Sequence, residues 1–165
     1  MEIVNRDFEI LTDYILVFHT YKFLNIDLIE DWVIELINLG YESEAIYTLA
    51  CFYKPIDYDE IKPYLEAVFL ELNLTTKNEE ESQKSHIRYF LNKIVKRENV
   101  RGNLKNMLHF YFEFAVDKDI VDFSVLQYVW DDLSAGEVNW YYKDLNLDTI
   151  EEEVIEKAEK WLIEN

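Results

Sequence analysis

Apolar residues recur at three- and four-residue spacing along almost the whole chain. Phe8, Leu11, Ile15 and Phe18 form one such stripe near the start of the sequence. This spacing places side chains on one face of an α-helix. The chain has only three glycines and two prolines, and it shows no hairpin signal. The pattern predicts an all-α protein, a single-domain bundle of about seven or eight helices packed as antiparallel pairs over residues 1–165.

The helix boundaries follow from the same pattern and from capping residues. Gly40 is suited to the position just after a helix, and Asp57 is suited to cap the start of another. A polar loop is expected near residues 74–83, and a strand is conceivable only around Val138–Tyr142. The predicted helices cover about residues 7–24, 27–39, 43–54, 57–72, the end of the polar segment to 98, 104–114, 120–133 and 149–163.

The composition is that of a folded protein. Half of the residues are hydrophobic and 16% are aromatic, whereas disordered acidic segments have few aromatics. The one cysteine, Cys51, lies in an apolar run, so we expect a buried small hydrophobic residue rather than a reactive thiol. The first residues lack a signal-peptide pattern, and no apolar stretch approaches the ~18–20 residues of a membrane span. We therefore expect a cytoplasmic protein with no membrane partner.

The net charge excludes some partners and favours others. The chain has 34 acidic and 16 basic side chains, a formal charge of −18. Small soluble domains typically have a net charge of roughly 2–8 in magnitude. Such a surface repels nucleic acids and anionic membranes, and it attracts basic proteins at a rate that falls with salt. We expect a basic protein partner and no nucleic-acid partner.

The charge is unevenly distributed along the sequence. Residues 1–82 hold 18 acidic and 5 basic side chains, residues 83–118 hold 3 and 8, and residues 119–165 hold 13 and 3. A basic helical pair therefore lies between two acidic flanks. The favoured explanation is that it neutralises its acidic neighbours on folding, and the alternative is an anion-binding face.

Catalytic signals are weak. His109 and Glu113 are four residues apart, so one helix face would bring them together as half of a metal site or as a base and its partner. A structural pair is the simpler interpretation. One cysteine and three dispersed histidines make a zinc site unexpected, and no phosphate-binding glycine loop or nucleophile motif occurs. We expect no enzyme, no metal and no cofactor.

Three consecutive aromatic residues, Trp140, Tyr141 and Tyr142, follow Gly136 in a segment without helical pattern. They cannot all point inward from one element. One interpretation is an exposed anchor for a basic protein partner. The other, which we favour, is that the segment folds back and closes the end of the bundle with Trp140 buried.

Two stretches carry a resemblance to known proteins. They are Trp32–Ala50 and Asp131–Tyr142, followed by a last helix that ends in Trp161 and Leu162. Together they resemble a family of small helical bacterial proteins of unassigned function. Small acidic proteins of this kind often serve as immunity proteins for bacterial toxins, an analogy of size and charge that implies no catalytic residues.

These observations favour a non-enzymatic acidic binding protein, in its most concrete form an immunity protein that neutralises a basic, nuclease-type bacterial toxin. The alternative is a helical scaffold or homodimeric interaction protein, and a third hypothesis is a metal-dependent hydrolase. The densest acidic cluster lies on the second and third predicted helices. The residues expected to bind the partner are Asp27, Glu30, Asp31, Glu35, Glu42, Glu44, Trp140 and Tyr141.

The charge predicts how stability depends on salt. Repulsion among carboxylates destabilises the compact state at low salt, and added ions screen it over a Debye length of about 10 Å at 0.1 M. The melting temperature should rise between low salt and roughly 0.2–0.5 M sodium chloride. A melting temperature that falls would show that attraction between the basic middle and the acidic flanks outweighs the repulsion.

Overall fold

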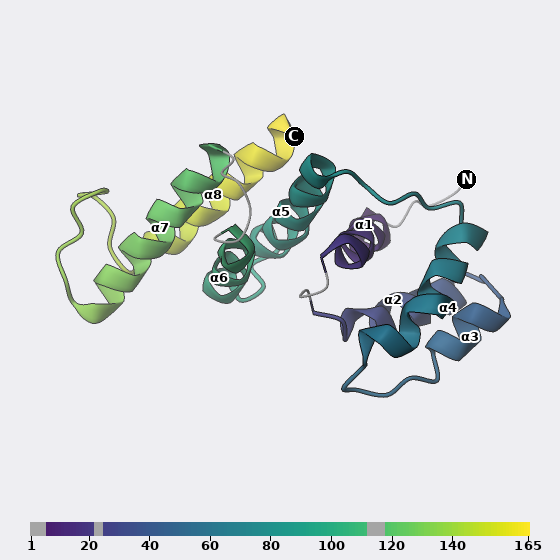
Figure 1. Cartoon of the computed structure of the whole chain (residues 1–165). Coiled ribbons are helices and arrows are strands. Elements are labelled where there is room, and N and C mark those ends of the chain that lie inside the picture. The colour runs from purple at the N-terminus through teal and green to yellow at the C-terminus, as the bar shows by residue number, and fades with distance from the viewer. Residues whose placement is uncertain (1–5, 22–24, 112–117) are drawn as a thin grey trace. The chain divides into compact units, whose positions relative to one another are not determined.

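The computed structural model describes residues 6–21, 25–111 and 118–165, and these fold entirely as helices and connecting segments (Figure 1). No strand occurs in the described ranges, including the Val138–Tyr142 segment where one was conceivable. The all-α prediction is confirmed. In order, the helices are α1 (Arg6–Thr20), α2 (Leu28–Asn38), α3 (Glu44–Leu49), α4 (Tyr58–Glu71), α5 (Glu79–Val95), α6 (Val100–Tyr111), α7 (Lys118–Ala135) and α8 (Ile150–Glu164).

The contacts of the chain group it into two compact units. Unit 1 comprises Met1–His86 and unit 2 comprises Ile87–Asn165, with the boundary inside α5. The prediction of a single domain stays a prediction. No helix of the described part is both long and apolar enough to cross a membrane.

The core of unit 1 gathers the apolar faces of α1 to α4. Helices α3 and α4 pack together, and α2 contacts both α1 and α3. Trp32 is fully buried, and its indole N–H donates to the Thr12 hydroxyl on α1 at 2.9 Å. Thr12 in turn donates to the Phe8 carbonyl at 2.8 Å. This chain of hydrogen bonds satisfies the one polar atom of the Trp32 side chain and fixes α1 against α2.

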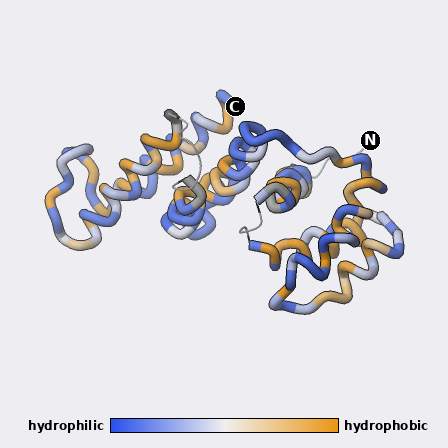
Figure 2. Tube along the Cα trace, viewed as in Figure 1, coloured by the Kyte–Doolittle hydropathy of each residue, from blue (hydrophilic) through white to orange (hydrophobic). Residues whose placement is uncertain are grey.

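Unit 2 is built on α6, α7 and α8, which contact one another pairwise. Hydrophobic and hydrophilic residues alternate along these helices, as the colours of the tube in Figure 2 show. Bidentate hydrogen bonds join Arg97 to Glu152 at 2.6 and 2.8 Å, and Arg101 lies 2.7 Å from Asp131. Lys157 of α8 lies 2.8 Å from Asp122 of α7. Ion pairs between the basic segment and acidic helices are what the internal-neutralisation explanation predicts.

Four helices end in the same hydrogen-bond pattern. After α2, the N–H of Gly40 donates to Ile37 and that of Tyr41 to Leu36, a Schellman motif that satisfies two terminal carbonyls. Equivalent bonds close α4, α5 and α7. The residues with left-handed backbone at these four ends are Gly40 (φ 86°), Asn73 (φ 53°), Arg97 (φ 62°) and Gly136 (φ 76°).

One detail differs from the sequence-based predictions, and one helix start agrees with them. Cys51 is exposed rather than buried, because α3 ends at Leu49 and the chain turns outward before the cysteine. Helix α4 begins at Tyr58, directly after the predicted cap Asp57, and Pro63 in its second turn does not move the start to Ile61 or Lys62. The Asp57 carboxylate accepts the Asp59 N–H at 2.8 Å and thereby caps the helix start.

Gly40 offers a direct test of the helix-end geometry. A Cβ at this position would meet nothing within 4 Å, so the effect of Gly40→Ala comes from the positive φ alone. We expect the variant to lower the free energy of unfolding by about 1 kcal/mol, measured by urea denaturation. Gly40→Asn is the matched control and should lose less, because asparagine tolerates this backbone. Equal losses in the two variants would contradict the explanation.

Candidate functional site

The predicted acidic residues of unit 1 separate into two groups in the structure. At the start of α2, Glu30 lies 3.1 Å from the Lys54 ammonium. The hydrogen bond that the Lys54 ammonium donates to Glu30 raises the pKa of Lys54, and the nearby charges of Asp31 and Asp27 raise it further. These three carboxylates therefore surround one lysine, which offsets part of their charge.

Glu42 and Glu44 belong to the other end of α2 and the start of α3. Both are exposed, and Ser43 between them caps α3 by accepting the Ile46 N–H at 3.2 Å. At 1.5 Å of rise per residue, the eight steps from Asp31 to Leu39 span roughly 12 Å. Glu35 lies between the groups and is half-buried. The acidic residues thus form an extended surface rather than one compact cluster.

The segment after α7, residues 136–149, is an ordered loop that we name the aromatic loop. Its centre is the buried side chain of Asn139. The Asn139 Oδ1 accepts the N–H groups of Tyr141 and Tyr142, both at 3.0 Å, and its amide donates to the Tyr142 carbonyl. The second half is fixed by Asn146, whose Oδ1 accepts the Asp148 N–H at 2.9 Å. The side-chain amides of Asn139 and Asn146 therefore make hydrogen bonds to the backbone of a loop that has no helix or strand hydrogen bonds of its own.

The aromatic loop presents its large apolar side chains to solvent. Trp140 is 75% exposed and Tyr141 is 69% exposed, and Val138 and Leu147 of the same loop are also exposed. The favoured interpretation, a plug with Trp140 buried, is wrong. The physical reason is that Asn139 takes the inward position, which turns its neighbour Trp140 outward. The sequence signal for this arrangement is Asn139 itself, because an asparagine side chain commonly accepts the backbone N–H two residues on.

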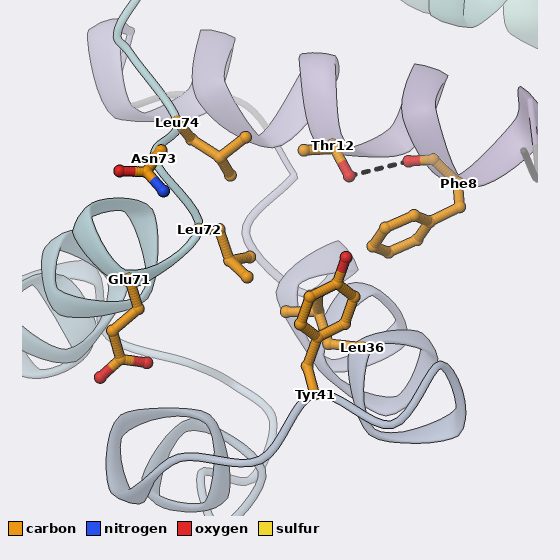
Figure 3. A pocket seen from close by; sticks show the side chains of 8 residues that line it. All are labelled: Phe8, Thr12, Leu36, Tyr41, Glu71, Leu72, Asn73 and Leu74. Atoms are coloured by element: carbon orange, nitrogen blue, oxygen red, sulfur yellow. Dashed lines mark hydrogen bonds between the residues drawn. The ribbon is translucent and has the colours of Figure 1, made fainter. Parts of the chain in front are cut away.

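Unit 1 contains a pocket that the sequence reasoning missed (Figure 3). Its volume is about 300 Å³, and it lies where the ends of α2 and α4 meet α1. Phe8 and Thr12 come from α1, Leu36 and Tyr41 from the end of α2, and Leu72 and Leu74 from the end of α4. Glu71 and Asn73 complete the lining. The pocket combines residues far apart in the sequence, so no local pattern indicates it.

A polar contact also joins α1 to α4. The Tyr58 hydroxyl lies 3.2 Å from the His19 Nδ1, and the His19 Nε2 is 3.9 Å from Glu66. Burial raises the pKa of Tyr58, and the charges of Glu66 and Asp59 raise it further. A protonated phenol is suited to donate a hydrogen bond, so these side chains link α1 to α4.

The His109–Glu113 pair falls partly outside the described residues. His109 is exposed near the end of α6, and Glu113 lies in the range that the structure does not describe. Within residues 6–21, 25–111 and 118–165, no group of three potential ligands gathers closely enough to hold a metal ion. The metal-dependent hydrolase stays a prediction.

Comparison with known proteins supplies no further evidence on the class of this protein. No family model, no curated protein and no solved structure matches the chain. The resemblance to small helical bacterial proteins stays a prediction.

Tryptophan fluorescence can test the conformation of the aromatic loop. Of the four tryptophans, Trp32, Trp130 and Trp161 are buried and Trp140 is exposed. Acrylamide should therefore quench one accessible fraction of the emission. Trp140→Phe should remove that fraction and leave the protected emission, with unchanged circular dichroism as its control. If wild type and variant are quenched equally, Trp140 is buried and the outward orientation is wrong.

Proposed function

We propose that this chain is a non-enzymatic binding protein whose aromatic loop anchors a basic protein partner. The observation that carries the proposal is the fixed conformation of Asn139, which holds Trp140 and Tyr141 outward. Solvent contact with large aromatic side chains is unfavourable, and hot spots of protein interfaces are enriched in tryptophan and tyrosine. An anchor already fixed before binding also loses less conformational entropy on association.

The charge of both units favours a basic partner. Unit 1 has 18 acidic and six basic side chains, which leaves −12, and unit 2 has 16 and ten, which leaves −6. Glu137, Asp144 and Asp148 lie within the aromatic loop itself. Carboxylates around an aromatic anchor suit a partner rich in arginine and lysine, because arginine also stacks on tryptophan and tyrosine rings.

The most concrete form of this proposal is an immunity protein that covers the basic surface of a nuclease-type toxin. A nuclease presents lysine and arginine to phosphates, and a carboxylate-rich protein can occupy the same surface. Long-range attraction then speeds capture. The analogy of size and charge supports this form, and the expected cytoplasmic location belongs to the same proposal.

The exposed apolar side chains of the aromatic loop also favour the alternative, a homodimeric interaction protein. Val138, Trp140 and Tyr141 of one copy would then cover those of another. Mutual repulsion of two chains at −18 opposes this assembly at low salt. Sedimentation of the wild type and Trp140→Ala at several concentrations and salt levels separates the two functions.

The binding test uses the protein encoded by the adjacent gene and measures association and dissociation rates at two salt concentrations. Trp140→Ala and Tyr141→Ala should each raise the dissociation rate about tenfold or more, because buried anchors set residence time. A variant that reverses the charges of Asp31, Glu42 and Glu44 to lysine should instead slow association and reduce its salt dependence. Asn139→Ala should weaken binding while it retains both aromatics.

Matched variants make the outcome specific. Tyr53→Ala removes another highly exposed aromatic and should bind as the wild type does. Reversal of three other exposed acids, Glu60, Glu156 and Glu159, keeps the net charge of the first charge variant, and it should slow association less. Unchanged dissociation for both loop variants would refute the anchor, and no binding of the adjacent gene's product would refute the toxin form.

A further inference from the structure

We propose that the pocket of unit 1 receives a lysine or arginine side chain of the basic partner. This inference rests on the proposed function and names a second point of contact for it. The pocket offers apolar walls for the stem of such a side chain and a negative rim for its charged end.

The negative rim arises from two helix ends. The last residues of α2 and α4 both line the pocket, and the C-terminal end of a helix carries a partial negative charge of about half a unit. Neither helix has a basic residue in its last turn to offset this charge. The Schellman bonds satisfy two carbonyls of each helix, and the later carbonyls have no helical partner. Glu71 adds a full negative charge at the edge of the lining, although its carboxylate points away from the other lining side chains in Figure 3.

The described lysines of unit 1 are engaged elsewhere, whereas Arg6 at the start of α1 forms no ion pair with a described residue. Each of the four lysines in its described part lies within 4 Å of a carboxylate, and the pairs are Lys54–Glu30, Lys62–Glu66, Lys77–Asp13 and Lys84–Glu80. Glu71 forms no ion pair within the described residues. None of these four lysines therefore pairs with Glu71 at the negative rim.

The walls suit the stem of a long basic side chain. Leu36, Leu72 and Leu74 supply aliphatic surface, and Phe8 and Tyr41 supply aromatic faces that attract a cation (Figure 3). The Thr12 hydroxyl already donates to the Phe8 carbonyl and accepts from the Trp32 indole, so a ligand need not form a hydrogen bond with it. A volume of about 300 Å³ is at the lower limit of small-molecule sites and fits one side chain.

The test uses two tripeptides as probes on the full chain, at matched ionic strength. Acetyl-Gly-Lys-Gly-amide carries the side chain in its peptide context, and acetyl-Gly-norleucine-Gly-amide has a similar stem without the ammonium. Amide and methyl NMR shifts should move at Leu36, Tyr41, Leu72 and Leu74 with the lysine peptide. We expect the lysine peptide to bind with a millimolar dissociation constant, about tenfold more tightly than the norleucine peptide. Its affinity should fall with added salt.

Two variants of α4 test whether the charge of Glu71 attracts the lysine peptide. Glu71→Gln should weaken the lysine peptide about threefold, and Glu60→Gln, the same change at the other end of α4, should leave it unchanged. Equal affinity for the two peptides, equal effects of the two variants, or shifts outside the pocket would each overturn the proposal. Because the titration needs no partner, its failure would leave the aromatic-loop test unaffected, and failure of the loop test would leave this result standing.

Discussion

Helix termination is the constraint on which both candidate binding features depend. A helix that stops must satisfy its last carbonyls, and this chain has few glycines with which to turn. Four helices do so with a left-handed residue and a Schellman pair of hydrogen bonds. The aromatic loop begins at one such residue, Gly136, and the pocket lies where two others, Gly40 and Asn73, end α2 and α4. The turns that close the helices therefore also build the surfaces available for binding.

The two units differ in how far their acidic side chains are balanced by basic ones. In unit 2, arginines of the basic segment pair with carboxylates of α7 and α8, and the Arg101 bond lowers the pKa of Asp131 although partial burial alone would raise it. In unit 1, six basic side chains face 18 acidic ones, so most carboxylates have no counter-charge. Exposed ion pairs add little stability each. The residue counts matter more, because they leave a net charge of −12 in unit 1 and −6 in unit 2.

The two binding features differ in how they are prepared for a partner. The aromatic loop is fixed by backbone N–H groups that donate to the side chains of Asn139 and Asn146, and these bonds hold its exposed rings in one conformation. The pocket is fixed instead by the packing of α1 on α2, by the packing of α4 on α3, and by the bond from Trp32 to Thr12. Preorganisation of either kind reduces the entropy lost on binding. The loop offers apolar contact area, and the pocket offers a place for charge.

The sequence by itself determined the helical class, the number of helices and most of their boundaries, because periodicity and capping act over three or four residues. It also placed the turn at Gly40 and the start of α3 after Ser43. Only the tertiary structure decided which residues of the loops face solvent. Cys51 is exposed and Trp140 points outward while Asn139 is buried, since in a segment without periodicity the exposure of a side chain depends on what packs beneath it. The pocket joins Phe8, Tyr41 and Leu74, and residues so far apart in the chain meet only through the packing of whole helices.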